Sequence, residues 1–196
     1  MHADGEARDR REGRVCPWWM CFTFDNVFRR MIMNPERIVS PWVHEGDAVL
    51  DIGPGRGFFT LPMAALAGKE GYVVAADVQA RLLSVIERRA DRAGVRASIR
   101  TKLVGTDSLD VDGAFDFILA FWMVHETPDR RLFLGKVRSL MKPGGRFLVA
   151  EPGMHVSAAS FARTEQEALD TGLTVIERPE IAWSRSILFG RGEEVK

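Results

Sequence analysis

The sequence has few cysteines, no excess of either charge and no long apolar run. Its two cysteines, Cys16 and Cys21, lie close together and do not make a disulfide scaffold, so we expect a cytoplasmic protein with reduced thiols. Lys and Arg number 27 and Asp and Glu number 27, which leaves no overall basic field to attract a nucleic acid. No apolar stretch approaches the ~20 residues that cross a bilayer, so membrane insertion is not expected.

Composition divides the chain into three parts. Residues 1–14 are charged and lack the apolar core of a signal peptide, so we predict a disordered tail. Residues 15–45 open with aromatic and sulfur-bearing side chains that water would not solvate well, and Asn34 is predicted to cap a helix there. Residues 46–196 are long enough for one domain with a core of its own.

The chain is organised around residues 49–57, Val-Leu-Asp-Ile-Gly-Pro-Gly-Arg-Gly. A buried strand is predicted to break into Gly53, Gly55 and Gly57 before a helix begins, and such a turn lets the backbone approach a small polar ligand. The dinucleotide fingerprint Gly-x-Gly-x-x-Gly is incomplete, because Phe58 stands where its last glycine belongs. Asp51, inside the strand end, would repel a pyrophosphate and suits a cationic ligand instead.

Apolar runs alternate with amphipathic stretches along the rest of the chain, which predicts an α/β fold. We expect a doubly wound, mostly parallel seven-stranded sheet with helices on both faces and the last strand antiparallel. A helix is expected to stop at the Lys-Pro-Gly-Gly turn of residues 142–145, and Pro62 is expected to distort the second turn of its helix. The predicted strands are 48–52, 72–77, 98–103, 115–121, 146–150, 174–176 and 186–189, and the predicted helices are 58–67, 81–93, 129–141 and 157–171.

Several polar or aromatic residues fall at the ends of predicted strands. Ligands of open α/β sheets bind outside the carboxyl ends of the strands, so these side chains are expected to converge on one site. They are Asp51, Asp77, Asp107, Phe121 and Glu151.

The motifs resemble class I S-adenosylmethionine-dependent methyltransferases, which have a Rossmann-like fold. The resemblance covers about residues 34–189 and is specific in 49–57, in Asp77, in 115–128 and in 140–151. Met-Val-His-Glu-Thr-Pro at 123–128 and Leu-Met-Lys-Pro-Gly-Gly-Arg-Phe at 140–147 are similar to the ubiquinone/menaquinone-biosynthesis-type branch, also called methyltransferase type 11. The resemblance implies S-adenosylmethionine as cofactor and a small-molecule acceptor as partner.

The resemblance also implies roles for single residues. Gly53, Gly55 and Gly57 would approach the methionine part of the cofactor, and Asp51 would orient its amino group. Asp77 would accept both ribose hydroxyls, the alternative being that it caps the next helix. Family members often carry Gly-Asp-Ala after the third strand, and here the acid of Gly-Thr-Asp is displaced by one position. The remaining expected cofactor contacts are Val78, Thr106, Asp107 and Phe121.

His125 is the candidate catalytic base. A sulfonium is an already activated methyl donor, so the enzyme mainly aligns and desolvates, and no base is obligatory. His125 follows the fourth strand, on the side where acceptors bind, and imidazole titrates near neutrality. The alternative is that it caps or packs the next helix. Trp122 and Glu151 are expected near the acceptor, and His155 only if residues 152–155 fold back toward the pocket.

The aromatic cluster near the N-terminus allows more than one function. Family members often carry helices there that fold over the pocket, so residues 15–42 are expected to form a lid. Its pair of thiols could hold a soft acceptor such as arsenic(III) or respond to oxidation, or could simply be buried. Cys-x₄-Cys is not a usual zinc spacing, and no metal site is predicted. The candidate substrate contacts here are Cys16, Trp18, Trp19 and Cys21.

Three functions therefore compete. The first is a small-molecule methyltransferase. The second is a nicotinamide-dependent oxidoreductase on the same general fold, against which Phe58 and Asp51 both argue. The third is a metalloid-binding or cofactor-binding regulator that senses through Cys16 and Cys21.

Overall fold

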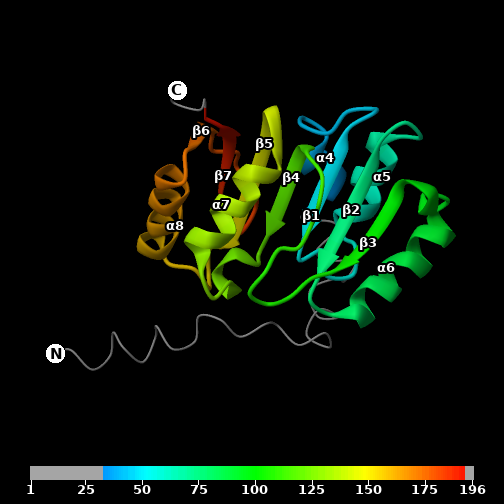
Figure 1. Cartoon of the computed structure of the whole chain (residues 1–196), viewed down its shortest axis with the longest axis horizontal. Coiled ribbons are helices and arrows are strands. Elements are labelled where there is room, and N and C mark those ends of the chain that lie inside the picture. Colours follow the sequence, from blue (N-terminus) through cyan, green and yellow to red (C-terminus); the bar gives the residue numbers. More distant parts are fainter. Residues whose placement is uncertain (1–32, 193–196) are drawn as a thin grey trace.

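A seven-stranded sheet forms the centre of the molecule (Figure 1). The structure is a computed structural model and describes residues 33–192. The strand order is β3-β2-β1-β4-β5-β7-β6, in which β1 to β5 run parallel and β7 runs antiparallel to both neighbours. This confirms the predicted doubly wound, mostly parallel sheet. The strands are β1 (Ala48–Ile52), β2 (Tyr72–Asp77), β3 (Ile99–Leu103), β4 (Phe115–Phe121), β5 (Met141–Pro152), β6 (Leu173–Glu177) and β7 (Ser184–Arg191).

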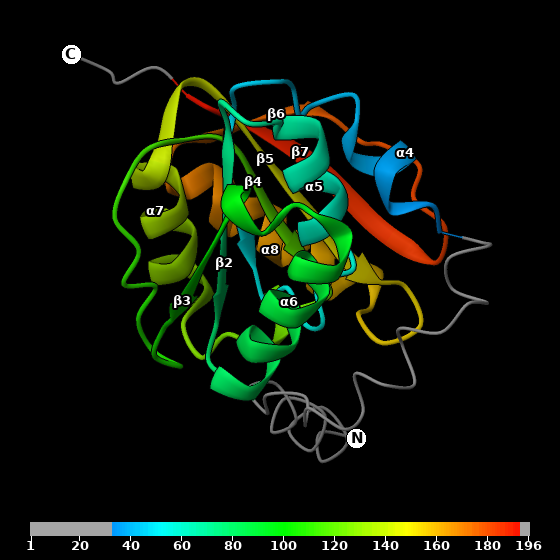
Figure 2. The same cartoon turned by 90° about the vertical axis from the view of Figure 1, so that its right-hand side faces the viewer.

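Helices cover both faces of the sheet (Figure 2). One hydrophobic core joins the sheet to the side of α4, α5 and α6, and a second joins it to α7 and α8. No helix connects β3 to β4, so Leu109 and Val111 of that loop cover the sheet there. The helices are α4 (Pro35–Val39), α5 (Thr60–Ala67), α6 (Ala80–Ala93), α7 (Arg130–Leu140) and α8 (Ala158–Asp170), with 3₁₀ turns η1 (Arg96–Ser98) and η2 (Val124–Glu126).

Short polar side chains cap three of these helices. The Asn34 side chain accepts from the Arg37 backbone N–H at 3.1 Å, as the sequence predicted. Asp129 accepts from Leu132 N at 2.9 Å, and Ser157 from Ser160 N at 3.1 Å. Each bond satisfies an amide that has no partner within the helix, which fixes where α4, α7 and α8 begin.

Two local predictions were wrong. Pro62 is the third residue of α5, where the backbone N–H has no intrahelical partner to lose, so it does not distort a second turn. The Lys-Pro-Gly-Gly segment is not a turn but part of β5, although α7 does end directly before it, at Leu140, one residue short of the predicted end. Lys142 is held there by Asp116 of β4 at 2.7 Å.

Residues 33–45 pack into the core rather than over a pocket. Met33, Val39 and Val43 are buried against the sheet, and the Trp42 ring stacks on Phe117 with centroids 6.2 Å apart. None of these residues lines the large cavity described below. The described part of the predicted lid therefore packs on the sheet and does not line this cavity, while residues 15–32 lie outside the described part of the chain, so the lid stays a prediction.

Candidate active site

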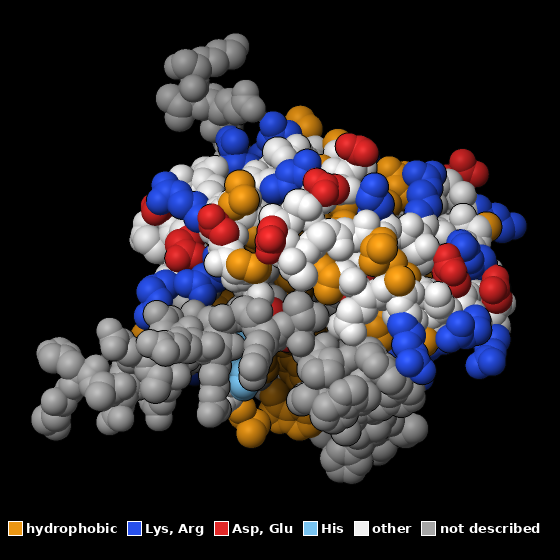
Figure 3. Space-filling model, turned by 60° about the horizontal axis from the view of Figure 1, so that its bottom comes forward, with side chains coloured by type: hydrophobic (Ala, Val, Ile, Leu, Met, Phe, Trp, Pro, Cys, Tyr) orange, Lys and Arg blue, Asp and Glu red, His pale blue; other side chains and the backbone are white. Residues whose placement is uncertain are grey.

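A cavity of about 1390 Å³ opens at the carboxyl ends of the parallel strands. Figure 3 shows a hollow with hydrophobic side chains on this face of the molecule. The lining comes from the loops after β1, β2, β3, β4 and β5, from α7 and from the residue before β7. This is the place where the doubly wound fold brings strand ends together, and it is where the sequence predicted the site.

The glycine turn after β1 forms one wall of the cavity. Gly55 lines the cavity at φ +55°, and a Cβ there would meet no protein atom within 4 Å, so its surface is open to a ligand. Gly57 is not one of the described residues that line the cavity. A Cβ at Gly57 would lie 2.8 Å from Leu61 Cδ1 and 3.2 Å from Ile86 Cγ1, so packing against α5 and α6 explains that glycine.

Alanine substitutions separate these roles, because Gly46, Gly55 and Gly57 all have positive φ. Gly46→Ala meets no atom within 4 Å and carries only the backbone strain, which we expect to lower the free energy of unfolding by about 1–2 kcal/mol. Gly57→Ala should cost about 1–2 kcal/mol more, because Leu61 and Ile86 must shift. Gly55→Ala should match Gly46→Ala in stability but bind the cofactor at least about tenfold more weakly. Denaturant unfolding measures the free energy of unfolding, and calorimetric titration measures the cofactor affinity. Unchanged cofactor affinity in Gly55→Ala would contradict a close approach of the cofactor to the Gly55 backbone.

Asp77 ends β2 beside the glycine turn. Its side chain is 6% exposed and accepts from the Gln79 backbone N–H at 2.8 Å. Burial raises the pKa of Asp77 to about 6, against the lowering effect of the Gln79, Gly55 and Val78 amides, and the charge of Glu126 raises it further. The bond to Gln79 shows that Asp77 supports the start of α6, and its position on the cavity wall leaves the ligand role open as well.

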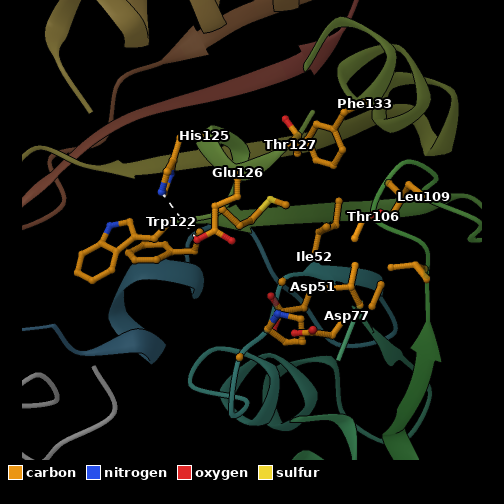
Figure 4. A pocket seen from close by; sticks show the side chains of 18 of the residues that line it. Asp51, Ile52, Asp77, Thr106, Leu109, Trp122, His125, Glu126, Thr127 and Phe133 are labelled. Atoms are coloured by element: carbon orange, nitrogen blue, oxygen red, sulfur yellow. Dashed lines mark ion pairs between the residues drawn. The ribbon is translucent and has the colours of Figure 1, made fainter. Parts of the chain in front are cut away.

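Asp51 is a second buried acid on the same wall. Its carboxylate is 2% exposed and accepts from Thr60 Oγ1 at 2.6 Å. Burial raises the pKa of Asp51 to about 7; the Thr60 hydrogen bond lowers it and the charge of Asp77 raises it. Asp51 and Asp77 lie side by side at this end of the cavity (Figure 4). Because a nearby positive charge stabilises ionised carboxylates, this end of the cavity favours a cation.

The other end of the cavity is aromatic and carries two histidines. Trp122 and Trp183 both line it, and both have left-handed backbones, with φ of 61° and 59°, which is rare for bulky residues. The Trp122 indole N–H donates to Ser184 Oγ at 2.9 Å, which ties the end of β4 to the start of β7. The rings of His125 and His155 pack edge to face with centroids 5.3 Å apart. Residues 152–155 do fold back, because His155 N bonds to Pro152 O at 2.9 Å.

Most of the residues predicted from the sequence meet at this cavity. Its walls include Asp51, Gly53, Gly55, Asp77, Val78, Thr106, Asp107, Phe121, Trp122 and His125. Glu151 does not line the cavity, and its carboxylate instead contacts Nδ1 of the His125 ring. Cys16, Trp18, Trp19 and Cys21 lie outside the described residues. Within residues 33–192, no three His, Cys, Asp or Glu side chains are placed to hold a metal ion.

Several lining residues were not foreseen. Met154 and Trp183 reach the cavity from beyond β5 and before β7, and Leu132, Phe133 and Lys136 from one side of α7. The spacing of the α7 residues on one helix turn and a half was visible in the sequence. Their exposure to the cavity was not, because it depends on how α7 packs against the sheet and the neighbouring loops.

Residues 43–181 match the family described as a methyltransferase domain. The chain belongs to this family. The match confirms the predicted class I S-adenosylmethionine-dependent methyltransferase, its Rossmann-like fold and its cofactor. Within residues 33–192, no helix has the length and apolar character to span a bilayer.

Individual relatives agree with the family. A ubiquinone/menaquinone biosynthesis C-methyltransferase UbiE of Marinomonas is 30% identical over 128 residues, which is 65% of this chain and 47% of that protein. A ubiquinone biosynthesis O-methyltransferase of Paramagnetospirillum magneticum is 32% identical over 116 residues, 59% of this chain and 43% of that protein. The chain thus spans about half the length of these methyltransferases. A crystal structure of a SAM-dependent methyltransferase from Aquifex aeolicus shares the fold, with a TM-score of 0.79 and 20% identity over 89% of this chain and 98% of that one.

The site fits S-adenosylmethionine (SAM). When bound, SAM supplies a methyl group on a positively charged sulfur. The cationic groups of SAM suit the acidic end at Asp51 and Asp77, and a buried carboxylate at the end of β2 can accept from both hydroxyls of a ribose. Gly55 leaves open the surface that a side chain would otherwise fill. The negatively charged pyrophosphate of NADH would be repelled by the carboxylates of Asp51 and Asp77. These two acids therefore fit SAM better than NADH.

The raised pKa values predict a pH dependence. Between about pH 4 and about pH 7 the unfolded chain releases the protons of Asp51 and Asp77 before the folded protein does, so the free energy of unfolding of the free protein should fall as pH rises. A bound cation favours the ionised carboxylates, so SAM binding should release protons and tighten between about pH 5 and about pH 8. Calorimetry in two buffers of different ionisation enthalpy counts those protons. Proton uptake on binding, or affinity that weakens with rising pH, contradicts the electrostatic account.

Proposed function

We propose that this methyltransferase acts on a small, flat, largely apolar acceptor. The observation that carries the proposal is that one cavity joins the acidic glycine end to the aromatic end. Its volume of about 1390 Å³ exceeds the roughly 300–1,000 Å³ of a pocket for one ligand, which leaves space for cofactor and acceptor together. Trp122, Trp183 and Met154 offer apolar surface to a planar ring.

The acceptor atom is proposed more broadly. The names of the relatives support a ring of the quinone-precursor type, but one relative is a C-methyltransferase and another an O-methyltransferase. We therefore propose a hydroxylated aromatic ring as the acceptor class, methylated on oxygen or on a neighbouring carbon. In both cases loss of the hydroxyl proton activates the ring. Methylation on oxygen replaces that proton, whereas methylation on carbon afterwards releases the proton of the methylated carbon and restores the hydroxyl. His125 lines the aromatic end of the cavity, where it could take the hydroxyl proton.

The test is methyl transfer from SAM labelled on its methyl group. The purified protein is incubated with labelled SAM and a series of hydroxylated aromatic acids, phenols and quinols, and S-adenosylhomocysteine and labelled product are measured. Label in a ring-bearing product, lost in Trp183→Ala, supports the proposal. Label transferred instead to arsenite would overturn it in favour of the metalloid alternative, which rests on Cys16 and Cys21 outside the described residues.

A further inference from the structure

Glu151 has an unusual environment for a carboxylate. It is 1% exposed, and within residues 33–192 no Lys or Arg side chain pairs with it. Both of its oxygens instead bind His125: Oε1 accepts from the backbone N–H at 3.2 Å, and Oε2 lies 2.5 Å from ring atom Nδ1. A buried carboxylate needs hydrogen-bond donors to offset its lost hydration, and His125 supplies both of them.

This contact decides which ring nitrogen of His125 carries a proton. Because an ionised carboxylate only accepts, the 2.5 Å contact pairs an ionised Glu151 with the tautomer that carries its hydrogen on Nδ1. The other nitrogen, Nε2, lies 4.0 Å from Oε1 of Glu126, a residue of the cavity wall. The ring thus has Nδ1 toward the buried Glu151 and Nε2 toward Glu126 on the cavity wall, and Figure 4 marks the second of these contacts with a dashed line.

We propose that Glu151 is the positioning residue of a His125–Glu151 pair, an inference that rests on the proposed function. Glu151 fixes the Nδ1–H tautomer and stabilises the imidazolium that forms when Nε2 takes a proton. The proton leaves the acceptor hydroxyl for Nε2 and passes to solvent, and the freed electron pair would form the bond to the methyl carbon. The methyl–sulfur bond would break with its electron pair left on sulfur, which gives S-adenosylhomocysteine. The Nδ1 proton stays on His125, hydrogen-bonded to Glu151. Glu151 itself touches neither ligand.

The sheet explains why the pair forms. Phe121 at the end of β4 pairs in register with Ala150 of β5, which places Glu151 beside the start of the β4 loop. That loop turns at η2, where Val124 is buried and anchors the turn. His125 lies in this turn, and the turn is anchored to the β4–β5 strand pair, which holds the His125 ring beside Glu151.

Glu151→Gln tests the assignment without knowledge of the acceptor. The amide oxygen can still accept from His125 N, but the amide NH₂ then faces Nδ1 and demands a nitrogen without hydrogen, so the proton moves to Nε2. Nitrogen-15 NMR of the imidazole, in protein bound to S-adenosylhomocysteine at pH about 8, reports the tautomer directly. We expect Nδ1–H in the wild type and Nε2–H in Glu151→Gln, with Nδ1–H kept in the matched control Glu126→Gln.

Nε2–H in the wild-type protein would overturn the proposal, even if the variant fails to fold. The same tautomer in wild type and a folded Glu151→Gln protein would also overturn it. With an acceptor in hand, Glu151→Gln should lower kcat at least about 10²-fold with little change in KM, and Glu151→Asp should recover part of that loss. Unchanged binding of S-adenosylhomocysteine in the variant separates this result from a failure of the proposed function, which would show as absent cofactor binding in the wild type.

Discussion

Replacing Asp77 by Ala should weaken SAM binding roughly 10- to 150-fold, which is the value of about 1.5–3 kcal/mol for hydrogen bonds to a charged group. Asp77 lines the cavity at the end of β2 and is buried enough that water competes poorly for its oxygens. Isothermal titration calorimetry measures the change.

A control is needed because Asp77 also supports α6 through Gln79. Asp110→Ala removes another acid of the same cavity, one that is exposed and accepts from Ser108 Oγ, so it should leave SAM affinity nearly unchanged. If Asp77→Ala loses thermal stability while its SAM affinity stays at the wild-type value, Asp77 is a helix-supporting residue and not the ribose contact.

Replacing His125 by Ala should lower turnover by ~10²-fold or more at neutral pH and leave SAM affinity in place. The acidic end of the cavity, where we expect SAM, is built from the loops after β1, β2 and β3, whereas His125 lies on η2 after β4. The pH–rate profile of the wild type should show an acidic limb that the variant lacks.

His155→Ala is the matched control, since His155 lines the same end of the cavity but is exposed and does not contact Glu151. It should keep the acidic limb. Full turnover in a well-folded His125→Ala protein removes the base from the mechanism and leaves alignment and desolvation as the chemistry. Loss of stability with turnover reduced only in proportion to the folded fraction identifies His125 as a packing residue.

The sheet was predictable because its signals are local. The run at 48–52 is buried along its whole length and the run at 72–77 in all but its first residue, and the bounds of both strands match the prediction to the residue. The acids at the ends of these strands, Asp51 and Asp77, come together because parallel strands end at one edge of the sheet. The glycine turn could also be predicted from the sequence. Of its three glycines, Gly53 and Gly55 line the cavity, whereas Gly57 is packed against side chains of α5 and α6.

The acceptor end was harder to foresee because it depends on long-range register. Glu151 meets His125 only because β4 and β5 pair with Phe121 opposite Ala150. Trp183 reaches the cavity because β7 returns antiparallel along β5, and Gly153 N bonds to Trp183 O at 2.7 Å. The register of neither strand pair can be predicted from the local sequence. A positive φ at a tryptophan is likewise set by tertiary packing, against the preference of the residue.

Titration of the protein with S-adenosylhomocysteine and with NADH tests the central claim most directly, because it needs no acceptor. The acidic, glycine-walled end of the cavity predicts one molecule of S-adenosylhomocysteine bound per chain, tighter binding of it than by Asp77→Ala, and no measurable heat with NADH. Binding of NADH with the same Asp77 dependence, or no binding of S-adenosylhomocysteine at all, would contradict the account.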